Sequence, residues 1–264
     1  MDVDKLRGSP IGQLVPISGF DPRFGEEYEG LAYVPDPLPA NLDLRAETYA
    51  TVIDAASAMA RADRSASLLP NPGLLARPAT RRAAVITSAL EGTYAALSDV
   101  FEADFLDADE VSSSVSEVRN YVIAAERAYE SIAQGQPIST GMLEDLQGEL
   151  LHGTPSDGTH AGRVRTTQVF IGVGNRRVTS ARFVPPPADH RLFDGLRSWE
   201  EWIRQPSTIP TIIRVAAAHY QFEALHPFHD GNGRLGRLVM ALQLMTAGEL
   251  RHPVLNISPS LEQH

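Results

Sequence analysis

The sequence predicts an all-α protein with one small β-hairpin, and two observations carry this prediction. Between residues 44 and 247, apolar residues recur mostly every three or four positions, which is the spacing of amphipathic helices. Residues 163–184 instead hold short β-like runs, Val169–Ile171 and Ala181–Val184, with glycine and asparagine between them. A chain of 264 residues is long enough to bury a sizeable core in one or two domains.

The first part of the chain divides into two regions. Residues 1–40 contain six prolines and no apolar period, so we expect an extended N-terminal arm. An N-terminal helical region over residues 41–108 follows, with helices expected over about 44–64, capped by Asp43, and over about 78–98. The apolar faces of these helices are expected to consist of Val52, Ile53, Ala56, Met59 and Ala60 in the first and Val85, Ile86, Ala89, Leu90, Tyr94 and Leu97 in the second.

A core region is predicted over residues 109–255. Its expected helices cover 110–134, the stretch from Ser139 or Thr140 to near Gly153, the stretch from the cap Asp189 to Ile203, 206–225 and 235–247. Ser258-Pro259 is a helix-start signal, so residues 256–264 are expected to begin a C-terminal segment. We expect either that this segment continues in a longer chain or that the chain is naturally short.

Composition limits the classes of function. The net charge of −10 argues against direct nucleic-acid binding. The chain has no cysteine, which excludes disulfides, zinc–thiolate sites and cysteine nucleophiles. It lacks both a signal-peptide pattern and an apolar run long enough to span a membrane. These observations predict a soluble cytoplasmic protein without membrane contact.

Residues 226–237 read His-Pro-Phe-His-Asp-Gly-Asn-Gly-Arg-Leu-Gly-Arg and lie between two predicted helices. Gly231–Gly233 allow a tight turn whose successive amides form an anion-binding nest, and the helix behind it adds the positive end of its dipole. Arg234 and Arg237 share a helix face and suit bidentate pairing with phosphate. The segment therefore predicts a nucleotide site.

Three further residues of this segment have an expected role. Asp230 stands at the mouth of the nest, where one carboxylate and phosphate oxygens together suit Mg²⁺. His226 titrates near neutrality and can remove a proton from an incoming hydroxyl. Phe228 is apolar, so we expect it to anchor the loop in the core.

The segment resembles the signature of the Fic family, His-x-Phe-x-(Asp/Glu)-Gly-Asn-Gly-Arg-x-x-Arg. All eight fixed positions are matched, by His226, Phe228, Asp230, Gly231, Asn232, Gly233, Arg234 and Arg237. Doc-type relatives that transfer phosphate carry lysine in place of Gly233, so the resemblance is to members that transfer AMP. It implies the Fic fold and the movement of AMP from ATP, with Mg²⁺, onto a Ser, Thr or Tyr hydroxyl of a protein.

The resemblance also implies a role for each matched residue. His226 would act as the base, Asp230 would hold Mg²⁺, and pyrophosphate would depart toward Arg234 and Arg237. The loop amides and Asn232 would stabilise charge on the transferred phosphoryl group.

A second resemblance lies upstream, on the helix expected over 78–98. Thr87, Glu91 and Gly92 match the (Ser/Thr)-x-x-x-Glu-(Gly/Asn) motif of the family's autoinhibitory helix. In relatives with this helix N-terminal to the core, the glutamate pairs with the second signature arginine, which here implies Glu91 with Arg237. Such a contact removes the partner of the ATP γ-phosphate and adds a like charge beside it. Some relatives use the same glutamate to position water for removing AMP, so this second reaction stays open.

The predicted hairpin occupies the position of the family's flap, which covers the nucleotide and pairs with the peptide of the target. The expected flap residues are Val169, Phe170, Ile171 and Gly172. A purely structural hairpin is the alternative. Arg163 and Arg165 precede it and could touch phosphate, but we expect them to be solvated surface charges. His219 is expected to be a hydrogen-bonded structural histidine.

Three other functions stay open from the sequence. His226, His229 and Asp230 could belong to a metal-dependent phosphohydrolase of the HD type, although such a site needs further ligands from other helices. A nonenzymatic adaptor could keep the loop as a scaffold. The same fold could also transfer UMP, phosphocholine or phosphate. The target protein, the chain itself included, and the oligomeric state also stay open.

Overall fold

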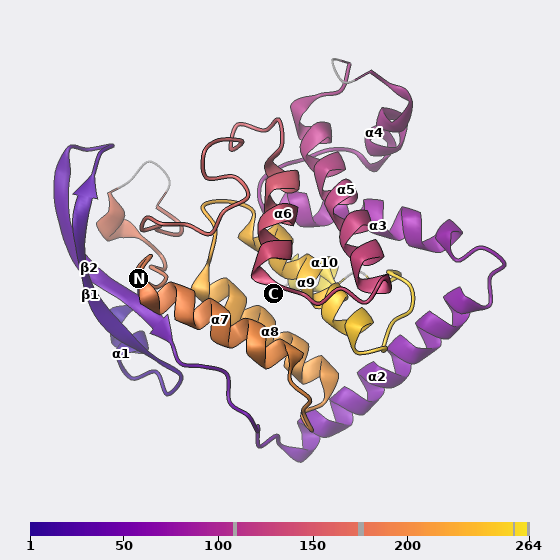
Figure 1. Cartoon of the computed structure of the whole chain (residues 1–264), viewed down its shortest axis with the longest axis horizontal. Helices are drawn as coiled ribbons and strands as arrows, with labels where there is room; N and C mark the ends of the chain where they lie inside the picture. The colour runs from indigo at the N-terminus through magenta and orange to yellow at the C-terminus, as the bar shows by residue number, and fades with distance from the viewer. Residues whose placement is uncertain (108–109, 174–176, 256, 263–264) are drawn as a thin grey trace.

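The computed structural model describes residues 1–107, 110–173, 177–255 and 257–262 (Figure 1). It is mostly helical with one small two-stranded antiparallel sheet, which confirms the predicted fold class. The longer helices are α2 (Ala46–Ser67), α3 (Gly73–Leu90), α5 (Ser113–Ala133), α6 (Thr140–Leu151), α7 (His190–Arg204), α8 (Thr211–Leu225) and α9 (Asn232–Thr246). The short helices are α1 (Val3–Arg7), α4 (Leu97–Glu102), α10 (Ser258–Glu262) and the 3-10 turns η1 (Ala103–Phe105) and η2 (Val178–Ser180).

Helices α8 and α9 form the centre of the molecule. Helix α8 packs on α7 and α9, while α5 packs on α3, α6 and α9, so one apolar core joins them (Figure 1). The caps follow the sequence, since Ser112, Ser139 and Asp189 each accept a hydrogen bond from the first turn of the helix they precede. The core side chains that are almost fully buried include Val118, Leu143, Leu192, Trp199, Phe222, Phe228, Leu235 and Leu238.

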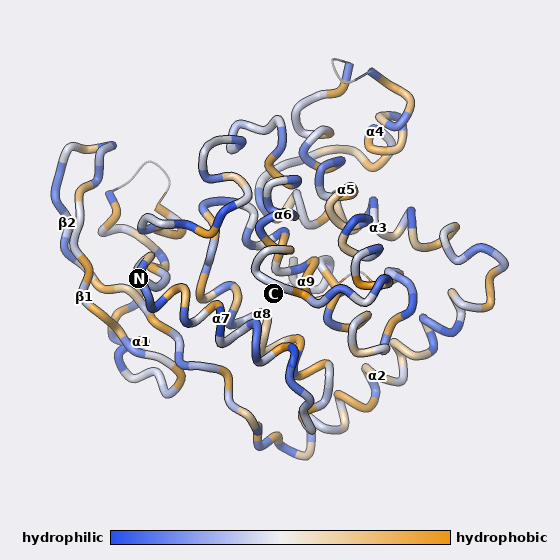
Figure 2. The backbone as a smooth tube through the Cα atoms, in the orientation of Figure 1, coloured by the Kyte–Doolittle hydropathy of each residue, from blue (hydrophilic) through white to orange (hydrophobic). Residues whose placement is uncertain are grey.

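Helix α2 departs from its predicted packing. It begins after Arg45, which makes no side-chain cap, so the cap predicted at Asp43 is wrong. Of its expected apolar face, Met59 is buried but Ile53 is 64% exposed. The helix runs along the edge of the molecule, and hydrophobic and hydrophilic stretches alternate along it (Figure 2). A helical period therefore identified the helix but not the face that it buries.

Helix α3 ends earlier than predicted. Leu90 is its last residue, Glu91 is the C-cap, and Gly92 follows with a φ of +91°, a left-handed conformation that glycine adopts without a Cβ penalty. Tyr94 was expected on the apolar face of this helix, but it lies beyond the helix end and is 74% exposed.

The sheet lies at the N-terminus, where the sequence predicted an extended arm. Strands β1 (Gly12–Asp21) and β2 (Glu26–Pro35) pair from Gly12 with Pro35 to Asp21 with Glu26, so the arm prediction for residues 1–40 is wrong. The prolines misled because proline usually interrupts a sheet. Proline is tolerated on an edge strand, where its missing N–H is not needed, and within the described residues β1 pairs with β2 alone.

The hairpin predicted over residues 163–184 is not formed as two strands. In the described part of this stretch, the only ladder element is an isolated antiparallel bridge between Ile171 and Phe183, and η2 interrupts the return segment. The turn residues Gly174 and Asn175 lie outside the described residues. The segment packs against the N-terminal sheet, because Tyr33 N–H donates to the Val184 carbonyl at 2.8 Å. The β-like residues of this stretch therefore pack on β2 and do not pair with each other as two strands.

Candidate functional site

The site is built on the loop between α8 and α9. His226 caps α8 in a left-handed conformation with φ 48° and ψ 62°, which turns the chain sharply away from the helix. Phe228 is fully buried, as predicted, and holds the loop to the core. The side-chain amide of Asn232 accepts a hydrogen bond from Phe228 N–H at 3.0 Å and donates one to the Phe228 carbonyl at 2.8 Å. The Asn232 side chain is therefore used to close the loop, and only its backbone amide is left to face a phosphate.

Arg165 lies beneath this loop. Its guanidinium donates to the carbonyls of His226 and Pro186 at 2.7 Å each, and to those of Leu225 and Thr167 at 3.2 Å. The residue is 1% exposed, so its prediction as a solvated surface charge is wrong. Burial lowers its pKa to about 10, which still leaves it charged at neutral pH. Arg165 thus helps to position the loop that carries His226, because it binds main-chain carbonyl groups at the start of that loop.

The His226 imidazole is held neutral. Burial lowers its pKa to about 4, and the nearby charge of Arg165 acts in the same direction. A hydrogen bond to the Glu223 backbone and the charge of Asp230 oppose this shift. At neutral pH the imidazole therefore has a free lone pair and can accept a proton, as a general base must.

Asp230 lies at the N-terminus of α9. Its carboxylate accepts from Ser156 Oγ and from Gly231 N–H, both at 2.6 Å, and approaches Arg234 at 3.5 Å. Its carbonyl accepts from the buried Gln147 at 3.1 Å. The side chain is 44% exposed, so a cation carried by a ligand can reach it. Ser156 and Gln147 had no recognisable signal in the sequence, because each is a single polar residue without a motif.

The two signature arginines have different surroundings. Arg234 is 4% exposed and lies 3.7 Å from Glu117, whose carboxylate also accepts from Thr93 Oγ1 at 2.8 Å. Among the described residues, nothing accepts a hydrogen bond from Arg234 Nε or Nη1. A buried guanidinium with free donors close to the positive end of a helix is suited to bind an anion.

Arg237 is engaged by α3, as the resemblance implied. Its Nη2 donates to Glu91 Oε1 at 2.5 Å and to the Thr87 carbonyl at 3.1 Å, and its Nε donates to Thr87 Oγ1. The Glu91 carboxylate also lies directly over Gly233, where a Cβ would overlap Oε1. The end of α3 therefore covers the glycine loop (Gly231–Gly233), and Thr87 and Glu91 accept the hydrogen bonds of the second signature arginine, Arg237.

A buried carboxylic acid, Glu223, lies behind the pair formed by Glu91 and Arg237. The side chains of Glu223 and His219 both face Gly236 of α9, where a Cβ would lie 3.2 Å from the imidazole. Burial raises the pKa of Glu223 to about 7; the charge of Arg237 opposes the shift and that of Glu91 reinforces it. Burial and the charge of Arg237 lower the pKa of His219. Its buried Nδ1 has no hydrogen-bond partner among the described residues, so the role expected for it, a hydrogen-bonded structural histidine, stays a prediction. Glu223 carried no motif by which it could be predicted.

His229, the variable position of the signature, lies in a separate cluster. Its ring lies 4.4 Å from that of His160, and its Nε2 is 3.3 Å from Thr167 Oγ1. Within the part of the chain that the structure describes, no three His, Cys, Asp or Glu side chains are arranged to hold a metal.

Comparison with known proteins agrees with this geometry. The Fic/DOC family model matches residues 137–244, and the Fic/DOC family N-terminal model matches residues 49–130. The fold is similar to that of a Fic family protein from Desulfovibrio desulfuricans G20, with a TM-score of 0.63 and 22% identity, covering 86% of this chain and 65% of that one. Fic-1 of Caenorhabditis elegans aligns with a TM-score of 0.57 and 26% identity, covering 77% of this chain and 61% of that one.

Fold and site together define a helical protein with a glycine loop at a helix N-terminus and a neutral histidine beside it. The chain belongs to the Fic/DOC family. It is 39% identical over 95 residues to protein adenylyltransferase fic-1 of Caenorhabditis elegans and 34% identical over 122 residues to protein adenylyltransferase Fic of Drosophila grimshawi. The alignments cover 35% and 45% of this chain but 17% and 22% of those proteins, so they span about a fifth of the relatives' length. No described helix is both long and apolar enough to cross a membrane.

Proposed function

We propose that this protein is an adenylyltransferase that moves AMP from ATP onto a Ser, Thr or Tyr hydroxyl of a target protein. The observation that carries the proposal is the combination of a neutral His226 with a glycine loop and Arg234 at one helix N-terminus. Relatives that are named protein adenylyltransferases support it. The target is a protein, and the chain itself is included among the candidates.

The transfer is an in-line displacement at the α-phosphorus. The target hydroxyl loses its proton to the free imidazole nitrogen of His226, and its oxygen forms a bond to the α-phosphorus. The bond from that phosphorus to the bridging oxygen breaks, and pyrophosphate leaves with the electron pair. The backbone amides of the glycine loop and the guanidinium of Arg234 stabilise the charge that develops on the phosphoryl oxygens.

Asp230 fits a magnesium ion that enters with ATP. It offers one partly exposed carboxylate, and the remaining ligands would be phosphate oxygens and water, which is the ligand set that Mg²⁺ prefers. The ion would neutralise charge on the phosphates. Gly231 N–H and Ser156 hold the Asp230 carboxylate in its orientation.

Glu91 keeps the enzyme inactive in this proposal. As long as its carboxylate occupies Arg237 and lies over Gly233, a γ-phosphate finds neither its cation nor free space, and it meets a like charge. ATP bound under these conditions would hold its α-phosphate away from the in-line direction. The flap segment Val169–Gly172 is proposed to lie along the peptide of the target.

The test uses ATP labelled at the α-phosphate. Glu91→Gly should transfer label to itself or to lysate proteins at least tenfold faster than wild type, and Glu91→Gly with His226→Ala should transfer none. Glu102→Gln, which removes another exposed carboxylate, is the matched control and should behave as wild type. Label transfer that persists without His226 would reject the base, and equal transfer by Glu91→Gly and wild type would reject the inhibition. Incubating labelled protein with wild type and no ATP tests whether AMP is also removed.

A further inference from the structure

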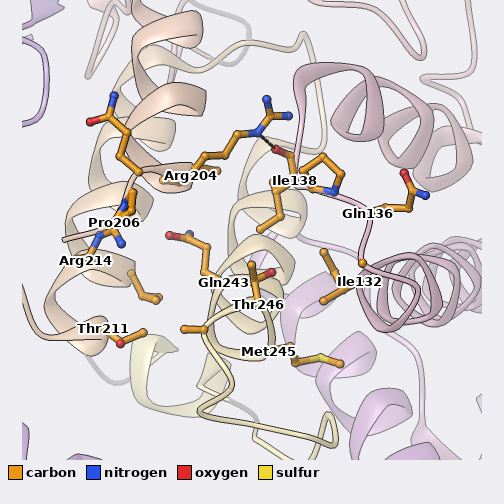
Figure 3. Close-up of a pocket in the computed structure, with 16 residues that line it drawn as sticks. Ile132, Gln136, Ile138, Arg204, Pro206, Thr211, Arg214, Gln243, Met245 and Thr246 are labelled. Carbon is orange, nitrogen blue, oxygen red and sulfur yellow. Dashed lines mark hydrogen bonds between the residues drawn. The ribbon is translucent and has the colours of Figure 1, made fainter.

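A cavity of about 620 Å³ lies at the end of the molecule opposite the glycine loop (Figure 3). The α5–α6 connection, the end of α7, the start of α8 and the end of α9 line it. Helix α8 has 15 residues at about 1.5 Å each, so this cavity is roughly 20 Å from His226. Apolar side chains form most of its wall, among them Ile132, Ile138, Ile203, Val215 and Met245.

Arg214 is the polar group that distinguishes this cavity. Its Nη2 donates to the Trp202 carbonyl at 2.6 Å, and its guanidinium lies 4.9 Å from the centre of the Trp202 ring. Its Nε is buried and has no acceptor among the residues that the structure describes, and Arg214 joins none of their ion pairs. Burial lowers its pKa. A partly buried cation without a counter-ion is unfavourable unless an anion is supplied.

Gln243 adds a second free donor in the same wall. The residue is 9% exposed, and its Nε2 is buried without a described acceptor. Figure 3 shows its side chain extending from α9 toward the side of the cavity that holds Arg214. Buried donors of this kind are normally paired in folded proteins. Both free groups are buried donors, so the ligand that would satisfy them is an acceptor toward which the two side chains turn.

Arg204, the other arginine of the wall, provides the contrast. It pairs with Glu200 at 2.9 Å and donates to the Ile138 carbonyl at 3.0 Å, so it needs no further partner. The free positive charge of this cavity is therefore localised at Arg214.

We propose that this cavity binds a small organic anion whose carboxylate or similar acidic group is held by Arg214 and Gln243 and whose apolar body fills the space between α5, α7 and α9. A cavity of this size lies within the range of about 300–1,000 Å³ that is usual for small-molecule sites. The site is separate from the glycine loop, and its occupation does not depend on the proposed AMP transfer.

The test measures the fluorescence of anilinonaphthalene sulfonate, an anion with an apolar aromatic body, on titration with the intact protein. Wild type should give saturable binding of one molecule per chain. Arg214→Gln should weaken it about tenfold, the usual effect of losing a charged hydrogen-bond partner. Gln243→Leu, which keeps the volume and removes the donor, should weaken it severalfold. Naphthoate should displace the probe, and the isosteric but uncharged naphthamide should not.

Arg197→Gln is the matched control, since Arg197 is 69% exposed on α7 and does not line the cavity. Thermal unfolding of each variant reports whether it is folded, and the uncharged probe phenylnaphthylamine reports whether the apolar cavity is intact. The proposal stands if Arg214→Gln lowers the affinity for the anion and leaves that for phenylnaphthylamine unchanged. Equal affinity of wild type and Arg214→Gln for the sulfonate, or no saturable binding by wild type, would overturn it.

Discussion

The buried guanidinium of Arg165 donates to the main-chain carbonyl of His226 at 2.7 Å. The bond joins the segment before the flap to the residue that turns the chain out of α8. His226 is the only described residue other than glycine with a positive φ. A left-handed conformation is unfavourable for a residue with a Cβ, so surrounding contacts must hold it in place. Arg165 supplies such contacts at Leu225 and His226, and it also binds the carbonyls of Thr167 and Pro186.

Replacing Arg165 by Met should destabilise the fold and the base together. The substitution keeps most of the volume but leaves four carbonyls without their donor, which costs about 2–4 kcal/mol. For a chain of this size the melting temperature should fall by roughly 5–15 °C. Arg163→Met, at a neighbouring exposed arginine, should change it little. Calorimetry checks this, and equal melting of both variants would contradict the role of Arg165.

Gly233→Ala should act through Glu91. The added Cβ would overlap Glu91 Oε1, so the carboxylate must leave its position for the methyl group to fit. In wild type the substitution should cost about 1–2 kcal/mol of unfolding free energy, and in the Glu91→Gly background close to none. Urea denaturation of the four proteins of this cycle measures the coupling. Equal costs in both backgrounds would mean that the two residues do not interact in solution.

The stability of the protein should depend on pH through Glu223. Its pKa of about 7 in the folded state lies above its ordinary value of 4.5, so between these values the folded protein holds a proton that the unfolded chain has lost. The contribution of Glu223 is therefore complete below about pH 4.5 and lost as pH rises through about 7. Wild type should lose up to about 3 kcal/mol relative to Glu223→Gln across this window.

The comparison with Glu223→Gln is needed because His219 and His226 shift in the opposite direction. The lowered pKa of His226 makes the folded state gain stability as pH rises from about 4 to 6.5, and the lowered pKa of His219 acts in the same direction. These histidines are present in both proteins, so their contribution cancels in the difference. If the free energy of unfolding changed with pH equally in the two proteins, Glu223 would not be protonated in the folded state.

Ser156→Ala tests the orientation of Asp230. The Ser156 hydroxyl donates to the carboxylate at 2.6 Å, and its removal leaves one oxygen without this bond. In the Glu91→Gly background, the Mg²⁺ concentration that gives half-maximal transfer should rise about three- to tenfold, as expected for loss of one supporting hydrogen bond. Ser131→Ala, on the exposed face of α5, is the control. An unchanged Mg²⁺ dependence would separate Asp230 from the metal.

The sequence predicted what depends on local pattern. Helices α5, α6, α7 and α9 follow their apolar period and their capping residues, and the segment from His226 to Arg237 forms one loop and helix start. It also led to the contact of Glu91 with Arg237, although these residues are 146 positions apart, because the family resemblance linked them.

Features that depend on tertiary partners were not predicted. The edge position of β1 makes its proline acceptable, and no local pattern contains that information. Arg165 reads as a surface charge because three of its four acceptors, in Pro186, Leu225 and His226, come from other segments of the chain. The packing of α2 was not predicted for the same reason, because a helical period of apolar residues does not show whether another element covers them.

The turn after α3 connects both signature arginines. Glu91 accepts a hydrogen bond from Arg237. Two residues later, Thr93 donates a hydrogen bond to Glu117, which lies beside Arg234. Glu91 is a C-cap and not an interior residue of the helix, so the turn can fray while α3 stays folded. Opening of a helix end needs far less free energy than unfolding of a helix. One local opening would thus release Arg237 from Glu91 and Glu117 from Thr93 in a single step.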